Sequence, residues 1–186
     1  MNLIASRHDQ KNLAIGAAAG MVAGLAANFV RKAVVQAPAM MAGDWADALV
    51  AEHKAALAIF DRLEASDDMQ VTKRATLLMQ LKHALTKHTI EEENAVYASL
   101  RDNGQKEAAD HLNHEHGYVK QYLYDLEIMP KSHSRWLPMV REFRGMIEQH
   151  MREEENEVFP RLKARLSVEE NRALSRAVNR EGIKLA

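Results

Sequence analysis

A motif of thirteen residues occurs twice in this chain, and the fold must accommodate both copies. The first copy, HTIEEENAVYASL, covers residues 88–100, and the second, HMREEENEVFPRL, covers residues 150–162, an offset of 62 residues. Both read His-x-x-x-Glu-Glu-Asn-x-Val-aromatic-x-x-Leu. Self-similarity at a fixed offset indicates a structural unit that is repeated.

A Glu-His pair precedes each copy of the motif. Glu52-His53 lies 35 residues before His88, and Glu115-His116 lies 34 residues before His150, counted from His to His. This spacing predicts two helical hairpins, each with one His on its first helix and one His and one Glu on its second. Two such hairpins that face each other would supply four imidazoles and two carboxylates, enough for a site with two metal ions.

Composition favours an all-α protein that holds metal through nitrogen and oxygen. Charged residues, Ala, Leu and Met are abundant, whereas Gly, Pro and aromatic residues are few. A length of 186 residues suits one domain with an additional element. The formal net charge of −1 gives no indication of a nucleic-acid partner. The chain has no Cys, which excludes thiolate ligands, disulfides and a Cys nucleophile.

Residues 1–43 are predicted to form an apolar helix and a linker. Residues 13–30 carry no charge, and Gly16, Gly20 and Gly24 lie on one side of the expected helix, where another helix can approach. Its length of about 27 Å makes it a borderline membrane span. Basic residues at both ends give no orientation, and the long apolar run argues against a signal peptide. The alternative is a soluble helix that packs on the domain or self-associates, so the protein is expected in the cytoplasm or at the cytoplasmic membrane.

Residues 44–186 are predicted to form an up-down-up-down four-helix bundle followed by a short C-terminal helix. Asp44 is a good N-cap for the first helix, and Asn103-Gly104 ends the second. Pro138 suits the first turn of the fourth helix, which Pro160 kinks rather than ends. The expected helices cover about residues 45–63, 69–101, 105–128, 138–159 and 168–180.

Each of the four long helices has an apolar stripe at the helical period that a His interrupts. Two stripes are also interrupted by a Glu one turn later, where both side chains lie on one face and reach a shared point. A surface pair is the alternative interpretation, but surface pairs need not fall on an apolar stripe or recur in a second hairpin. Burying an unpaired carboxylate is costly, and a metal ion compensates for it. The predicted metal ligands are His53, His88, Glu92, His116, His150 and Glu154.

The choice within each Glu triplet follows from helical geometry. The middle Glu lies four residues after its His, and Glu91 and Glu153, three residues after, remain alternatives. Glu93 and Glu155 are expected to point away from the site into solvent.

On the third helix, His116 is the predicted ligand because its Glu-His pair matches that of the first helix and because apolar residues flank it. His111 and His114 are expected to be surface or outer groups, and no such pattern supports His8, His83 and His133. Four imidazoles and two carboxylates suit a first-row transition metal rather than Mg or Ca. The sequence does not separate iron from manganese or zinc.

From about Asp44 to Leu166 the chain resembles the hemerythrin-like, His-His-Glu cation-binding domain family, through its paired His-x-x-x-Glu-Glu motifs that end in Tyr or Phe. The resemblance implies a four-helix bundle with two non-haem iron ions, joined by two carboxylates and usually an oxo or hydroxo group. It implies that the four His are terminal iron ligands and that Glu92 and Glu154 bridge. The ferritin-type site is similar in architecture but uses Glu-x-x-His and more carboxylates.

The chain departs from the oxygen-carrying hemerythrins at one position. Those proteins have a second His on the third helix, four residues after the first, where this chain has Lys120. A protonated Lys cannot bind a metal ion, so one iron would lack a ligand or take water. This argues against simple reversible oxygen transport and leaves an open position for peroxide, oxygen or nitric oxide. Lys120 could instead hydrogen-bond a bound oxygen species.

Three functional hypotheses follow. The first is a non-catalytic di-iron protein that binds dioxygen or a related small oxidant for sensing, storage or stress protection. The second is a di-iron peroxidase or oxidase, for which Tyr97, Tyr118 and Tyr122 are candidate redox side chains, although packing is the expected role of each. The third is an assembly or membrane-attached protein in which residues 13–30 associate and the metal only stabilises the bundle.

Overall fold

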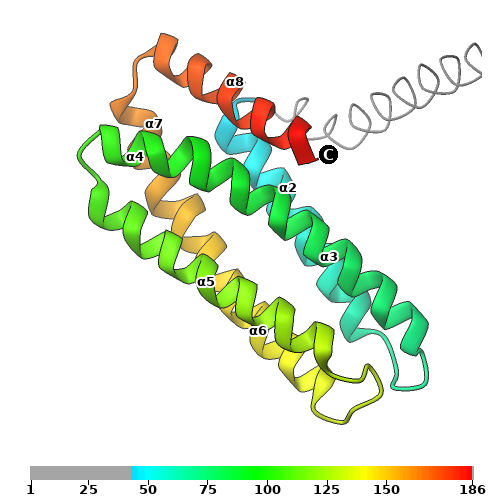
Figure 1. Ribbon diagram of the computed structural model, residues 1–186. Coiled ribbons are helices and arrows are strands. Elements are labelled where there is room, and N and C mark those ends of the chain that lie inside the picture. The colour runs from blue at the N-terminus through cyan, green and yellow to red at the C-terminus, as the bar shows by residue number, and fades with distance from the viewer. Residues whose placement is uncertain (1–42, 186) are drawn as a thin grey trace, which may run out of the picture.

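The computed structural model describes residues 43–185, and all regular structure in this part of the chain is helical. Four long rods lie side by side, and a fifth helix packs against the first two of them, near one end (Figure 1). Two of the rods contain a short π-helical turn. The elements are α2 (Trp45–Glu64), α3 (Val71–Glu91), η1 (Glu92–Val96), α4 (Tyr97–Asp102), α5 (Lys106–Ile128), α6 (Trp136–Glu153), η2 (Glu154–Val158), α7 (Phe159–Arg165) and α8 (Val168–Leu185).

The predicted four-helix bundle with a C-terminal helix is confirmed, with some boundaries shifted. The helix expected over residues 69–101 is the rod formed by α3, η1 and α4. The fourth rod, formed by α6, η2 and α7, begins before Pro138 and continues beyond Pro160 to Arg165. Pro160 lies just after the π-helical turn η2, where the regular pattern of hydrogen bonds between residues four apart is already interrupted. Helix α8 is also longer than expected and ends at Leu185.

The predicted apolar helix over residues 13–30 lies outside the described part of the chain. Between residues 43 and 185, no helix is both long and apolar enough to cross a membrane.

Polar contacts fix the start of the first rod and the turn of each hairpin. Asp44 caps α2 with a capping box, in which its carboxylate accepts from backbone N–H groups of the first turn. Arg74 closes the turn between α2 and α3 by donating to the hydroxyl and carbonyl oxygens of Ser66. Lys131 closes the turn between α5 and α6 by donating to three backbone carbonyls near the end of α5. Gly104 has a φ of +71° between α4 and α5, which glycine adopts without strain.

The apolar core is divided into two clusters with a polar layer between them. One cluster fills the half near the hairpin turns and includes Phe60, Trp136 and Phe143. The other fills the half covered by α8 and includes Trp45 and Phe159. Burial of each such side chain stabilises the fold by roughly 1.5–3 kcal/mol. The layer between the two clusters contains the predicted metal ligands, all of which are buried.

Candidate metal centre

The structure brings the six predicted ligands together in the layer between the two core clusters. His53 and His88 form one group with Glu92 and Glu154, and the other two His form a second group with the same carboxylates. All six side chains are buried. Because both groups share Glu92 and Glu154, the arrangement is that of two adjacent cation sites joined by two carboxylates.

The imidazoles face one another in pairs through their Nε2 atoms. The Nε2 atoms of His53 and His88 are 2.9 Å apart, and those of His116 and His150 are 3.2 Å apart. Two nitrogens that each bind a metal at about 2.1 Å and at right angles lie roughly 3 Å apart. The separation within each pair thus suits two ligands of one metal ion.

The carboxylates complete both groups at similar distances. The contacts are Glu92 Oε1 to His88 Nε2 at 3.2 Å, Glu92 Oε2 to His116 Nε2 at 3.4 Å, and Glu154 Oε2 to the Nε2 atoms of His53 and His150 at 3.4 Å each. Glu92 Oε1 and Glu154 Oε2 are buried, and despite these nearby nitrogens neither oxygen accepts a hydrogen bond. A buried carboxylate oxygen without a partner is costly, and a cation would offset that cost. These residues therefore fit a pair of metal ions.

Each imidazole also contacts a second carboxylate through its Nδ1 atom. The four pairs are His53 with Glu155 at 2.7 Å, His88 with Glu52 at 3.1 Å, His116 with Glu93 at 3.1 Å and His150 with Glu115 at 2.7 Å. In the neutral tautomer with the proton on Nδ1, that N–H donates to the carboxylate and the Nε2 lone pair faces the centre. We call Glu52, Glu93, Glu115 and Glu155 the outer carboxylates.

The outer carboxylates correct one prediction and extend another. The expectation that Glu93 and Glu155 point away into solvent is wrong, because both turn back onto a His of the opposite hairpin. Glu52 and Glu115 belong to the repeated Glu-His pairs, and their recurrence was the available signal for this role. Each of these two contacts the second His of its own hairpin.

The alternative ligands of the triplets lie outside both four-residue groups. Glu91 is buried and pairs with Lys87, whose ammonium lies 2.9 Å from Glu91 Oε2 and also contacts Glu52. Burial and the neighbouring Glu52 carboxylate raise the pKa of Glu91 to about 8. Burial alone would raise the pKa of Glu52 as well, but His88 and Lys87 outweigh it and lower that pKa to about 2. Glu153 is partly exposed and approaches His111 at 3.6 Å.

Without a metal ion, the imidazoles and carboxylates of the centre compensate one another. Burial opposes the charge on His116, but Glu92 and Glu93 outweigh it and raise its pKa to about 9. The pKa of His88 is also raised well above its usual value, since Glu92 and Glu52 outweigh the effect of burial. Conversely, burial would raise the pKa of Glu92, but His88 and His116 lower it strongly. The metal-free centre therefore holds protons that a metal ion would displace.

One hydroxyl reaches the centre. The Tyr97 hydroxyl donates to Glu154 Oε1 at 2.7 Å and lies 3.1 Å from His116 Nε2. Tyr97 is fully buried, and burial together with the nearby carboxylates raises its pKa well above the usual value, so it stays protonated. Its counterpart in the repeat is Phe159, whose ring stacks 6.2 Å from the ring of His53. The two halves of the centre therefore differ chemically.

The other candidate side chains lie away from the ligands. The packing role expected for Tyr118 is wrong, because its side chain is exposed, whereas that expected for Tyr122 is confirmed, because its ring stacks on Phe143 of the core. Lys120 is 64% exposed and pairs with Glu93 at 3.1 Å, which directs its ammonium to an outer carboxylate. The remaining His residues in the described chain are not in the two groups: His83, His111, His114 and His133.

Comparison with known proteins agrees with this geometry. Residues 45–162 match the family model described as the hemerythrin HHE cation binding domain. An uncharacterized hemerythrin-like protein of Schizosaccharomyces pombe is 30% identical over 129 residues, which cover 67% of this chain and 62% of that protein. The chain thus spans less than two thirds of the length of this relative. No solved structure matches the chain significantly.

Proposed function

The chain belongs to the hemerythrin HHE cation-binding domain family, and from this premise we propose that it binds two iron ions and, at that centre, a small oxidant such as dioxygen, peroxide or nitric oxide. The proposed role is oxygen or iron sensing, storage or stress protection, as a binding protein in the cytoplasm or at its membrane. The observation that carries the proposal is the sharing of Glu92 and Glu154 by two His pairs, with a buried oxygen on each carboxylate that lacks a hydrogen-bond partner.

The residues divide into three tasks in this proposal. The four His and the two shared Glu hold the ions through Nε2 and carboxylate oxygens. The outer carboxylates fix the tautomer and the orientation of each ring, which raises the basicity of Nε2. The apolar clusters on both sides exclude bulk water and lower the local dielectric. When bound, two iron ions supply one-electron redox chemistry and an exchangeable position for the small ligand.

Metal analysis combined with visible spectroscopy tests the proposal. Purified protein is expected to contain about two irons per chain and to have a visible absorption band that disappears on reduction. After the same treatment with iron, the Glu92→Ala variant should have neither the two irons nor the absorption band. No metal, or a single zinc per chain, would refute the di-iron proposal.

A di-iron peroxidase or oxidase is the second candidate, and Tyr97 favours it. Its protonated phenol points at the centre, where it could donate a proton to a small oxidant. Exposure of the reduced protein to dioxygen separates the candidates. A binding protein gives a stable new spectrum, whereas an oxidase or peroxidase oxidises rapidly and consumes peroxide over many turnovers.

The proposed association through residues 13–30, with a membrane or with a second copy of the chain, is tested by deleting residues 1–40. Unchanged solubility and an unchanged oligomeric state would count against it.

A further inference from the structure

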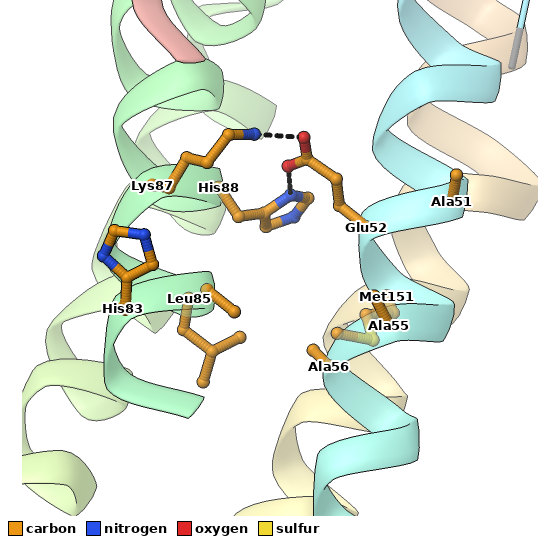
Figure 2. A pocket seen from close by; sticks show the side chains of 10 residues that line it. Ala51, Glu52, Ala55, Ala56, His83, Leu85, Lys87, His88 and Met151 are labelled. Atoms are coloured by element: carbon orange, nitrogen blue, oxygen red, sulfur yellow. Dashed lines mark hydrogen bonds and ion pairs between the residues drawn. The ribbon is translucent and has the colours of Figure 1, made fainter. Parts of the chain in front are cut away.

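A cavity of about 180 Å³ lies between α2 and α3, directly beside the candidate metal centre. Most of its wall is apolar and consists of Ala51, Ala55, Ala56, Ala84, Leu85 and Met151. Figure 2 shows Ala55 and Ala56 of α2 on the side of this space opposite Leu85 of α3, with Met151 behind Ala55. An apolar cavity of roughly 150 Å³ in another protein holds benzene or xenon, so this space is ample for a diatomic molecule.

The polar lining of this cavity consists of His83, at an exposed position, and of Glu52, Lys87 and His88, whose charged groups pair with one another. Lys87 pairs with Glu52, and Glu52 also accepts from Nδ1 of His88 at 3.1 Å (Figure 2). The same ammonium lies 2.9 Å from the carboxylate of Glu91. Charges that already have partners offer little to a charged ligand, because such a ligand would have to break these pairs after losing its own hydration. The cavity therefore suits a small neutral molecule.

A second, much smaller void lies against the His ligands. It measures about 10 Å³, and its lining includes His88, His116 and His150. That volume is close to the size of one water molecule as a probe. Leu85, His88 and Met151 line both this void and the larger cavity. Two apolar side chains, Leu85 and Met151, thus lie between the larger cavity, which can hold a diatomic molecule, and the small void beside the His ligands.

The separating side chains can move. Met151 has three rotatable side-chain bonds and adapts readily to irregular spaces. It also lines a third cavity, with Leu57 and Glu155, into which its thioether can swing. A further cavity of about 110 Å³ between α3 and α5 approaches the same void, but there the shared residues include β-branched Thr89 and Val119, which are stiff at χ1.

We infer that the cavity between α2 and α3 is the entry and holding site for a neutral diatomic ligand, and that Met151 with Leu85 forms its gate to the metal centre. The existence of a ligand at the centre rests on the proposed function, whereas the route itself depends only on the cavity and its gate. The first measurement below therefore needs no metal.

The metal-free test uses hydrogen peroxide as a neutral probe and Met151 as the reporter. Peroxide transfers one oxygen to the thioether, which gives methionine sulfoxide and water. Met79 is 65% exposed and serves as the internal reference. Ala55→Trp places a large side chain over the cavity from an exposed position, and should slow Met151 oxidation about tenfold relative to Met79, as followed by mass spectrometry. Thr86→Trp, the matched control at the α3–α5 cavity, should change the rate of Met151 oxidation, relative to that of Met79, less than twofold.

The iron-loaded test measures the bimolecular rate of nitric oxide binding to the reduced protein by stopped flow. Ala55→Trp should lower that rate about tenfold, Met151→Ala should raise it several-fold, and Thr86→Trp should leave it within twofold. Thermal unfolding checks that each variant folds, and Ala84→Phe fills the same cavity from α3 if Ala55→Trp does not fold. A nitric oxide binding rate that is unaffected by filling the cavity, or lowered equally by Thr86→Trp, would overturn the route, because Met151 can also be oxidised from the cavity that it lines with Leu57 and Glu155. If the protein binds no iron but Ala55→Trp slows Met151 oxidation as expected, the proposed function is refuted and the inferred route is still supported.

Discussion

Tyr97 donates its hydroxyl hydrogen bond to Oε1 of Glu154, 2.7 Å away, and thereby joins the first copy of the motif to the second. We expect Tyr97→Phe to destabilise the metal-free protein by about 1–3 kcal/mol, because the carboxylate oxygen loses its donor in a buried site. Urea unfolding measures this change. Tyr118→Phe, at an exposed position, is the control and should change the free energy of unfolding by less than about 0.5 kcal/mol.

The shared carboxylates should not be equivalent to the His ligands in their effect on metal content. Glu92 belongs to both four-residue groups, whereas His53 belongs to one. We expect Glu92→Ala to abolish tight binding of both ions and His53→Ala to leave about one per chain. Elemental analysis after dialysis gives both numbers. Two independent sites would be indicated if Glu92→Ala retained one ion.

Loss of an outer carboxylate should weaken metal binding without removing a ligand. We expect Glu155→Gln to lower metal affinity about 10- to 100-fold, since it weakens the hydrogen bond that orients His53. Competition with a chelator measures the affinity. The matched control is Glu157→Gln, two residues later, whose carboxylate is 64% exposed and pairs with Arg161 on the surface. Equal losses in both variants would show that overall charge, rather than the contact with His53, controls the affinity.

Metal uptake should release protons, with a defined dependence on pH. The pKa of His116 is about 9 in the metal-free protein, so at pH 7.5 its ring is protonated, and a metal must displace that proton. Apparent metal affinity should therefore rise with pH and level off above about 9. Zinc titration in weakly buffered solution measures the proton release. Uptake without proton release would contradict a protonated metal-free centre.

The stability of the metal-free protein should decrease as pH rises, whereas the metal affinity should increase. A His whose folded pKa is raised stabilises the fold fully below its unfolded pKa of 6.5, and this contribution is lost as pH rises through about 9. The stability due to His116 should therefore decrease between about pH 6.5 and pH 9. Urea unfolding of the metal-free protein at a series of pH values checks this, with His116→Gln as the variant in which the decrease is smaller.

The helical period of the apolar residues and the repetition of the thirteen-residue motif were sufficient to predict the helices and the six residues at the centre. A His that interrupts an apolar stripe lies at the same depth as its apolar neighbours, and the second hairpin repeats that position. The local pattern also located Asp44 and Gly104 at helix boundaries. These features depend on the chain within a few turns, which is the range over which sequence patterns are informative.

The role of Tyr97 could not be predicted in the same way, because the helix changes its period at the centre. On an α-helix, a residue five positions after Glu92 points about 140° away from it. The π-helical turn η1 begins at Glu92, and its hydrogen bonds join residues five apart. Tyr97 therefore returns to the face of Glu92, and Phe159 returns to that of Glu154 across η2. The directions of Glu93 and Glu155 also depend on contacts between hairpins, which no local pattern contains.

The outer carboxylates have a consequence for the proposed binding of metal ions. Glu155 contacts His53 and Glu93 contacts His116, so each hairpin orients a ring that belongs to the other. A single hairpin carries two of the four rings but lacks the second shared carboxylate. A half-assembled chain thus has no complete site, and tight metal capture requires that both hairpins have already docked. Under the proposed function, bound ions would bridge the interface between the hairpins, and the rate of metal release would then limit the rate at which the hairpins separate.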